Sequence, residues 1–453
     1  MFISQKTLRF LLLSLLFPVF SAAQPNFNDI TTLLNDSLDK AFNGKVCVMV
    51  MHGDSLVYNQ GLGGYDSNST GGVASATKTF SGLLMLKLAN LGLLNLDDSI
   101  GKFIPYATQK GKGAGTLRQN FSHTGGWSGT GGDEFLNSRT LTLEQSVDSI
   151  ITYDSLIYTP GRAFKYTGVA MQVAGRCAEV AAKRNWNELF NDYIKTPLNL
   201  SKTAFSSTTN PRIAGGINSC AADLLKIARL IRANGRVGNT QVIDSIVMQE
   251  LWKDQTNGVI QLGTPYPFSP VYNNPYNADT IRYGIGTWLD IYNPVQKYQE
   301  QISGAGAFGT EIWVNRCNNT CGALFTMSLY AKAEKTIFHM LDMVNAIYPN
   351  QCYTGSTSID AGADETTSDN VNFSNSPNPF NPETKLSFVL NKETSYRLDI
   401  YNLKGMKIAC FSGTAKKGTN QIKWSTENLP ATLYLANLST PISRYSRLLS
   451  LVR

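Results

Sequence analysis

The chain of 453 residues is long enough for two or three domains, one of which can bury a large hydrophobic core. With 42% apolar and 16% charged residues, it has the composition of a globular protein, which excludes an intrinsically disordered one. The formal net charge of +7 comes from residues 373–453, which contain eleven Lys and Arg and four Asp and Glu. The neutral remainder shows no basic patch with interleaved aromatic residues, so we expect no nucleic-acid partner.

The first 23 residues are typical of a secretory signal peptide. Lys6 and Arg9 supply a positive start, residues 10–20 form an apolar run too short to cross a bilayer, and residues 21–23 are small. We therefore expect cleavage after Ala23 and export of the mature chain. An uncleaved anchor is the alternative, which the shortness of the apolar run disfavours. We expect no transmembrane helix further along the chain.

Hydrophobic periodicity predicts a first domain over residues 24–350 that mixes helices and strands. The expected helices cover residues 29–42, 76–91, 169–182, 221–233 and 332–347. The expected strands cover residues 46–50, 55–61, 281–291 and 311–329. A long helical insertion between two groups of strands predicts an α+β fold, with an antiparallel sheet flanked by helices and a helical region beside it.

Composition changes after the first domain. Residues 351–372 are mostly small and polar, which is typical of a linker. Residues 373–453 contain short alternating apolar runs separated by turn residues, which predicts a small β-sandwich.

Export permits disulfides among the seven cysteines. Cys317 and Cys321 flank a predicted hairpin tip. They could form a disulfide with each other or be two separate thiols, and both alternatives stay open. The cysteine and histidine spacings match no zinc site, and we expect neither a metal nor another cofactor.

The tetrad Ser75-Ala76-Thr77-Lys78 is the main candidate for chemistry. A lysine three residues after a serine at the start of a helix shares its face, and a buried lysine of lowered pKa can take the serine proton. The alternative is an N-cap serine with a solvated lysine. A second Ser-x-x-Lys tetrad, Ser37 to Lys40, lies on the wet side of the first predicted helix and is interpreted as accidental.

Motifs in a fixed order over about residues 30–347 resemble those of the serine β-lactamase-like family, which includes penicillin-binding proteins, class C β-lactamases and family VIII esterases. They cover residues 72–80 (GVASATKTF), 92–100 (GLLNLDDSI), 117–126 (LRQNFSHTGG), 160–168 (PGRAFKYTG), 196–203, 214–224, 283–286 and 306–314. The resemblance implies a β-lactamase/transpeptidase-like fold. It also implies a serine hydrolase that forms an acyl-enzyme on Ser75.

The same resemblance implies that Tyr166 is the third catalytic residue, sharing a proton network with Lys78. A phenol is a poor base at neutral pH unless a cation lowers its pKa, and we expect Lys78 to be that cation. The alternative is a structural tyrosine after a Pro-Gly turn.

Two departures from the family pattern bear on the substrate. The Tyr-x-Asn motif ends in Gly168, and the Lys-Thr-Gly motif aligns on Gly304, Ala305 and Gly306, without a cation. The resemblance then implies an oxyanion hole from the N–H groups of Ser75 and Ala307. Without the cation we expect a small neutral ester or amide substrate, and most of all a carboxylic ester.

Three other interpretations stay open. Within the same chemistry, the protein could be a β-lactamase or a D-alanyl-D-alanine carboxypeptidase acting on a peptidoglycan-like substrate. The missing asparagine and cation also leave room for a non-catalytic binding protein of the same fold. A Ser-His-Asp triad is disfavoured because no Gly-x-Ser-x-Gly elbow is present and His123 is interpreted as a core residue. The glycine-rich residues 126–133 form either a mobile wall or a plain surface loop.

The tail carries its own resemblance. Residues 376–384 (SPNPFNPET) and 400–405 (IYNLKG) are similar to the C-terminal sorting domain of type IX secretion. This implies the secretion machinery as a partner and a secreted or cell-surface location reached through the periplasm. A carbohydrate- or surface-binding β-sandwich is the alternative.

Overall fold

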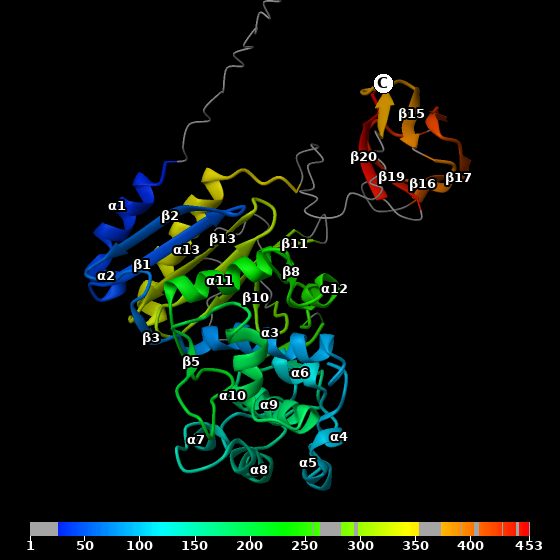
Figure 1. Cartoon of the computed structure of the whole chain (residues 1–453). Coiled ribbons are helices and arrows are strands. Elements are labelled where there is room, and N and C mark those ends of the chain that lie inside the picture. Colours follow the sequence, from blue (N-terminus) through cyan, green and yellow to red (C-terminus); the bar gives the residue numbers. More distant parts are fainter. Residues whose placement is uncertain are drawn as a thin grey trace, which may run out of the picture. The chain divides into compact units, whose positions relative to one another are not determined.

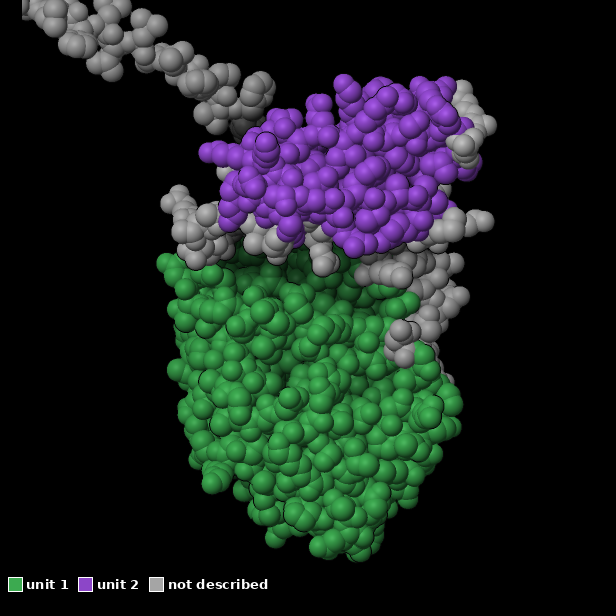
Figure 2. Space-filling model, turned by 90° about the vertical axis from the view of Figure 1, so that its right-hand side faces the viewer, with its two compact units in different colours: residues 1–356 green, residues 357–453 purple. Residues whose placement is uncertain are grey.

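The computed structural model describes residues 26–256, 258–262, 282–293, 298–352, 373–390, 392–402, 407–427, 429–440 and 444–452. The chain divides into two compact units, residues 1–356 and 357–453, which Figure 2 colours separately. The expected signal peptide and residues 353–372 of the expected linker lie outside the described residues. Among the described helices, none has both the length and the apolar character needed to span a membrane.

The larger unit is built on a six-stranded antiparallel sheet of order β10-β11-β12-β13-β1-β2 (Figure 1). Its strands are β1 (Val46–His52), β2 (Ser55–Leu62), β10 (Trp288–Asn293), β11 (Tyr298–Ala305), β12 (Glu311–Asn315) and β13 (Thr320–Thr326). Because β1 pairs with β13, the early and late parts of the unit complete one sheet. The residues between them form a separate helical region.

Helices cover both faces of this sheet, and further helices form the region between β2 and β10 in the chain. They are α1 (Asn28–Asp36), α2 (Leu38–Phe42), α3 (Thr77–Asn90), α4 (Ile100–Phe103), α5 (Pro105–Gln109), α6 (Leu117–Phe121), α7 (Asp133–Leu136), α8 (Leu143–Tyr153), α9 (Gly168–Ala182), α10 (Trp186–Phe190), α11 (Ala221–Arg232), α12 (Ser245–Met248) and α13 (Tyr330–Ile347). The short strands of this unit are β3 (Thr70–Gly72), β4 (Ala163–Phe164), β5 (Ala204–Phe205), β6 (Ile217–Cys220), β7 (Arg236–Val237), β8 (Thr240–Gln241) and β9 (Ile260–Gln261).

Strand β1 shows why the sheet is apolar on both faces. Successive side chains of a strand point to opposite faces. Val46 and Val48 join the core that includes α1, α2 and α13. Cys47 and Met49 join the core that includes α3 and α11. A strand covered on both faces has a continuous apolar run and not an alternating one.

The expected α+β fold is confirmed, but β11 was not predicted, and residues 311–329 contain the two strands β12 and β13. The single helix predicted over residues 29–42 is broken at Ser37 into α1 and α2. The strand predicted over residues 281–291 begins only at Trp288. Before it, Gly286 has φ +78°, and a Cβ there would lie 2.3 Å from the carbonyl oxygen of Lys78. This segment turns against α3 and does not extend the sheet.

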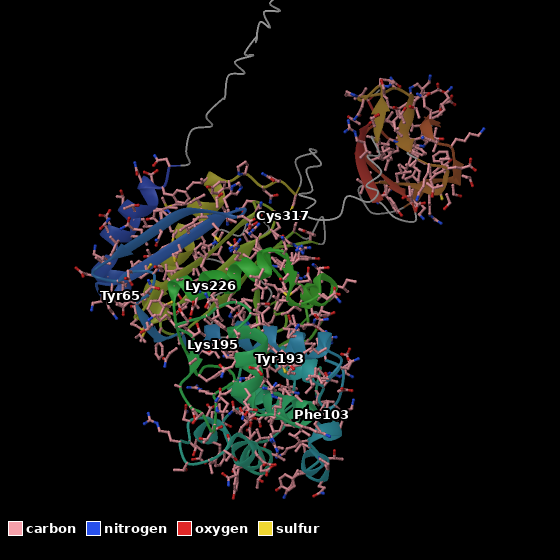
Figure 3. All side chains as sticks on the ribbon, viewed as in Figure 1. Tyr65, Phe103, Tyr193, Lys195, Lys226 and Cys317 are labelled. Atoms are coloured by element: carbon pink, nitrogen blue, oxygen red, sulfur yellow. A yellow bond between two sulfur atoms is a disulfide. The ribbon has the colours of Figure 1, made fainter. Side chains whose placement is uncertain are left out.

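Neither of the two possibilities left open for Cys317 and Cys321, a disulfide between them or two separate thiols, is the arrangement observed. Cys317 instead bonds to Cys352, and Cys321 is a buried free thiol. Cys321 lies within β13, paired with Val314 of β12, and its side chain belongs to the core that includes α11. Cys317 lies in the turn between these strands, labelled in Figure 3, so the disulfide joins this turn to the segment after α13.

The smaller unit consists of two antiparallel sheets around one core, which agrees with the expected β-sandwich. Their strand orders are β14-β15-β18 and β17-β16-β19-β20. The strands are β14 (Ser374–Ser376), β15 (Glu383–Leu390), β16 (Thr394–Asn402), β17 (Lys407–Ala415), β18 (Gly418–Ser425), β19 (Leu433–Ser439) and β20 (Arg444–Ser450). Leu386 and Phe388 of one sheet share this core with Leu398 and Ile400 of the other.

Candidate active site

Ser75 lies in a tight turn that joins the short strand β3 to helix α3. The turn is a 3₁₀ helix over Ala74–Ala76, and α3 begins at Thr77, so Ser75 precedes the α-helix and does not open it. Ala74 has φ +45°, a left-handed conformation that is uncommon for a residue with a Cβ. Backbone strain of this kind gathers at functional sites. Ser75 itself is half-buried.

Lys78 is brought onto Ser75 by the first turn of α3. Its Nζ donates to the Ser75 Oγ at 2.9 Å and to the carbonyl oxygen of Ala214 at 2.8 Å. The side chain is buried, with 4% of the residue exposed. Burial lowers the pKa of Lys78 to about 7, with the positive charge of Arg212 as a second cause. An amine of this pKa is uncharged in a useful fraction of molecules at neutral pH and can accept a proton from Ser75.

Arg212 is a charged neighbour of the site that the sequence analysis did not single out. The residue is exposed, and its guanidinium lies against Gly215. A Cβ built on Gly215 would lie 3.4 Å from the Nε of Arg212. Gly215 follows Ala214, whose carbonyl receives the Lys78 hydrogen bond. In sequence, Arg212 lies two residues before the family motif that begins at Ala214. This closeness to the motif is the one sequence feature that could have indicated Arg212 as a neighbour of the site.

Tyr166 completes a cluster with Ser75 and Lys78. The Tyr166 side chain interacts with Ser75, which acts to lower the pKa of the phenol, and the Nζ of Lys78 lies 4.5 Å from the centre of the Tyr166 ring. The structure thus brings together the three residues singled out in the sequence. The second tetrad forms no such cluster, since Ser37 lies between α1 and α2 and Lys40 is exposed.

The expectation that Lys78 lowers the pKa of Tyr166 is wrong. Burial raises the pKa of this phenol well above its ordinary value, and the interaction with Ser75 opposes this only in part. The reason is that the same burial removes water from both groups. Burial favours the neutral form of each, so it lowers the pKa of a lysine and raises that of a phenol. Tyr166 is therefore a neutral hydroxyl that can donate a hydrogen bond.

The strand edge aligned with the Lys-Thr-Gly motif runs very close to the nucleophile. A Cβ on Gly306 would lie 2.2 Å from the carbonyl oxygen of Val73, and a Cβ on Gly304 would lie 2.3 Å from the Oγ1 of Thr79. Both glycines are needed for this close approach, because a Cβ at such distances would overlap the other atom. The Cβ of a lysine or histidine at position 304 would therefore overlap a side chain of α3.

Two backbone N–H groups at this edge are available as donors. Within the described part of the chain, neither the N–H of Ser75 nor that of Ala307 donates a backbone hydrogen bond. The turn around Ala307 is held by its other groups: Gly306 N–H donates to Thr310 and Tyr330 N–H donates to the Ala307 carbonyl. An oxyanion hole requires N–H groups that are not already engaged, so both groups stay candidates for the expected one.

Position 168, where the family has an asparagine, has little room for one. A Cβ there would lie 3.0 Å from the Cδ1 of Leu136 and 3.6 Å from the Cβ of Ala214. Both of these nearest atoms are apolar.

The glycine-rich residues 126–133 are neither a plain surface loop nor a loose wall. Trp127 is 1% exposed, and its Nε1 donates to Asn120 at 2.9 Å. Asp154, also 1% exposed, accepts hydrogen bonds from the Ser128 hydroxyl and from the N–H groups of Gly129 and Gly131. This carboxylate therefore fixes the loop from inside the fold.

A serine hydrogen-bonded to a buried lysine, beside a glycine-containing edge of an antiparallel sheet, defines a hydrolase of the beta-lactamase fold. The family model described as Beta-lactamase matches residues 38–342, and the chain belongs to this family. Protein flp of Staphylococcus aureus (strain MW2) is 26% identical over 191 residues, which cover 40% of this chain and 38% of protein flp. The chain therefore spans well under half the length of the curated relatives that it matches.

Solved structures share the fold. A putative beta-lactamase from Bacteroides dorei DSM 17855 aligns with a TM-score of 0.62 and 24% identity, covering 70% of this chain and 99% of the other. EstCE1, described as a hydrolase with promiscuous acyltransferase activity, aligns with a TM-score of 0.57 and 15% identity, covering 70% and 97%. A putative 6-aminohexanoate-dimer hydrolase from Bacillus anthracis aligns with a TM-score of 0.54 and 16% identity, covering 70% and 81%.

Proposed function

We propose that this protein is an exported serine hydrolase that cleaves carboxylic esters through an acyl-enzyme on Ser75. The observation that carries the proposal is the 2.9 Å contact between the Ser75 hydroxyl and a buried lysine whose pKa is about 7. This contact supplies a nucleophile and its base without a histidine or a metal.

In the proposed reaction, neutral Lys78 takes the proton of Ser75 while the Oγ attacks the ester carbonyl carbon. The carbonyl electron pair moves onto its oxygen, which is held by the N–H groups of Ser75 and Ala307. Collapse of this intermediate breaks the bond to the alcohol oxygen, which receives the proton from Lys78 through the Tyr166 hydroxyl. Water then attacks the acyl-enzyme with the same two groups managing its protons, and the carboxylic acid leaves.

The choice of an ester rests on what surrounds the nucleophile. No cation fits at Gly304, where the resemblance would place the partner of a substrate carboxylate. Arg212 is the observation that favours the second candidate, an anionic β-lactam or D-alanyl peptide, because it is an exposed arginine whose guanidinium lies against Gly215 and whose charge acts on Lys78.

A comparison of two chromogenic substrates separates these candidates. We expect kcat/KM for a short-chain aryl ester to exceed that for a chromogenic cephalosporin by about 100-fold, which corresponds to about 2.7 kcal/mol of transition-state binding. Comparable turnover of the two would contradict the esterase assignment. In that case Arg212→Gln should raise KM for the cephalosporin and leave KM for the neutral ester unchanged.

The pH dependence of ester hydrolysis tests the role of Lys78. Activity is expected to rise with pH through about 7, as Lys78 loses its proton and becomes a base. Arg212→Gln removes a positive charge that disfavours protonated Lys78, so the pKa rises and the rising limb moves to higher pH. The control is Arg229→Gln, an exposed arginine on α11 that pairs with Asp54 at 3.6 Å. A limb that moves to lower pH in Arg212→Gln, or none between pH 5 and 9, would contradict this role.

Export is proposed from the two ends of the sequence. We propose that residues 1–23 direct the chain to the periplasm and that residues 373–453 pass it to type IX secretion machinery, giving a secreted or cell-surface enzyme. The support is the apolar run at residues 10–20 and the SPNPFNPET motif before β15. Removal of residues 373–453 should leave the enzyme in the periplasm, and undiminished secretion would favour a surface-binding sandwich instead.

A further inference from the structure

His123 lies in the turn after α6 and holds the backbone on both sides of Tyr166. The N–H of Lys165 donates to the His123 carbonyl oxygen at 2.9 Å, and the N–H of Thr167 donates to the His123 Nδ1 at 3.3 Å. The histidine ring lies 4.3 Å from the Tyr166 ring, measured between their centres. One residue thus fixes the chain before the tyrosine, the chain after it, and one face of its ring.

The hydrogen bond at Nδ1 fixes the tautomer of His123. Because Nδ1 accepts from Thr167, the hydrogen of the neutral ring is on Nε2. The residue is 1% exposed, and burial and the charge of Lys78 hold its pKa well below the ordinary value, so the ring stays neutral. A neutral ring with Nδ1 engaged by the backbone is a fixed acceptor and not the base of a triad.

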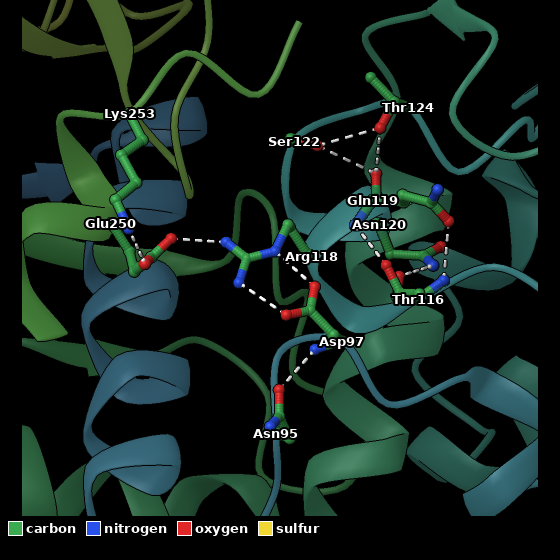
Figure 4. Close-up of polar contacts among 10 residues, drawn as sticks. All are labelled: Asn95, Asp97, Thr116, Arg118, Gln119, Asn120, Ser122, Thr124, Glu250 and Lys253. Atoms are coloured by element: carbon green, nitrogen blue, oxygen red, sulfur yellow. Dashed lines mark hydrogen bonds and ion pairs between the residues drawn. The ribbon is translucent and has the colours of Figure 1, made fainter.

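The turn that carries His123 is itself held firmly (Figure 4). A capping box between Thr116 and Gln119 closes the start of α6, and the hydroxyls of Ser122 and Thr124 are 3.1 Å apart. Arg118 ties the same helix to two other segments through ion pairs with Asp97 at 2.6 Å and Glu250 at 2.5 Å.

The backbone conformation adds a second constraint on this position. His123 has φ +60°, a left-handed conformation that asparagine tolerates better than most residues with a Cβ. A buried histidine that served only to fill space would not need an acceptor at Nδ1.

We propose that His123 is a positioning residue for Tyr166, aiming the Tyr166 hydroxyl at Ser75 and its ring at Lys78. His123 does not touch the reacting atoms and acts through the tyrosine. The inference rests on the proposed function, since it concerns the same acyl transfer. Displacement of a catalytic group by about 1 Å costs about 10²-fold in rate, so the expected effect is on kcat.

Three variants test this role. His123→Leu removes the acceptor at similar volume, His123→Asn keeps an acceptor near the Nδ1 position and tolerates the backbone, and Tyr166→Phe removes the hydroxyl that is positioned. Hydrolysis of a neutral aryl ester is measured well below the midpoint of thermal unfolding of each variant. We expect His123→Leu to lower kcat by about 10- to 100-fold with KM nearly unchanged, and His123→Asn to recover most of the loss.

A double-mutant cycle separates positioning from a merely structural role. Adding His123→Leu to Tyr166→Phe is expected to cause little further loss, because the hydroxyl that His123 positions is already gone. A full additional loss in the double variant, or a normal kcat in His123→Leu with only a lower melting temperature, would overturn the proposal. If the wild-type enzyme hydrolyses no ester and a fluorophosphonate, a reagent for activated serines, forms no adduct on Ser75, the proposed function itself has failed and the positioning role falls with it.

Discussion

Replacing Ser75 with alanine is expected to lower kcat/KM for a neutral aryl ester by about 10⁴-fold or more, because the reaction loses the atom that forms the covalent intermediate. The loss should be chemical and not structural. Ser75 is half-buried, and removal of one hydroxyl at such a site changes the free energy of unfolding by about 1 kcal/mol or less. The measurement is steady-state hydrolysis, with urea unfolding of the same preparation.

The chain offers a matched control for this variant. Ser37 begins the second Ser-x-x-Lys tetrad and is also half-buried, but it lies between α1 and α2. Ser37→Ala should therefore hydrolyse the ester at the wild-type rate. Equal activity of Ser75→Ala and wild type would contradict the assignment and would make a non-catalytic binding protein the better account of the fold.

Replacing Lys78 with methionine is the second variant with a large expected effect. Methionine keeps the length of the side chain and removes the amine that contacts Ser75 at 2.9 Å. Loss of a general base of this kind lowers kcat by about 10²- to 10⁴-fold. The rise of activity with pH through about 7 should disappear from what remains, since the group that titrates there is Lys78.

Lys78→Met is expected to lower activity but to leave the free energy of unfolding unchanged or to raise it. A buried lysine is costly to keep charged, and methionine fills the same space without that cost. Lys78→Met should therefore unfold at the same or a higher urea concentration than wild type, which separates lost chemistry from lost folding. Lys40→Met, on the exposed lysine of the second tetrad, is the control. Full activity in Lys78→Met would exclude the lysine as the base.

The sequence was most informative where the structure depends on neighbours along the chain. The contact between Ser75 and Lys78 follows from helical spacing, and it is present as expected. The strand predicted over residues 46–50 is likewise present as β1, whose continuous apolar run is typical of a strand buried on both faces.

Features that depend on distant segments were not predicted. The partner of Cys317 is Cys352, because β12 and β13 place Cys321 in the core and leave Cys317 in the turn. Arg212 affects Lys78 only because the loop before β6 lies against α3. The pairing of Cys317 has no local signal in the sequence, and the only local signal for Arg212 is its closeness to the motif that begins at Ala214.

The error over Tyr166 has a different origin. Two effects compete for a phenol beside a lysine in a buried site: the cation lowers its pKa, and the loss of water raises it. The motif shows which groups meet, but not how much water surrounds them. In the structure burial dominates, so we propose the neutral form of Lys78, and not a tyrosinate, as the base.

The most direct test of an activated Ser75 is reaction with a fluorophosphonate, because this reagent needs a nucleophile and makes no demand on substrate specificity. The chain without its first 23 residues is treated with the reagent, and intact mass and peptide mapping are compared for wild type and Ser75→Ala. The account predicts a single adduct on Ser75 that is absent from the variant. No adduct, or an adduct on another serine, would contradict it.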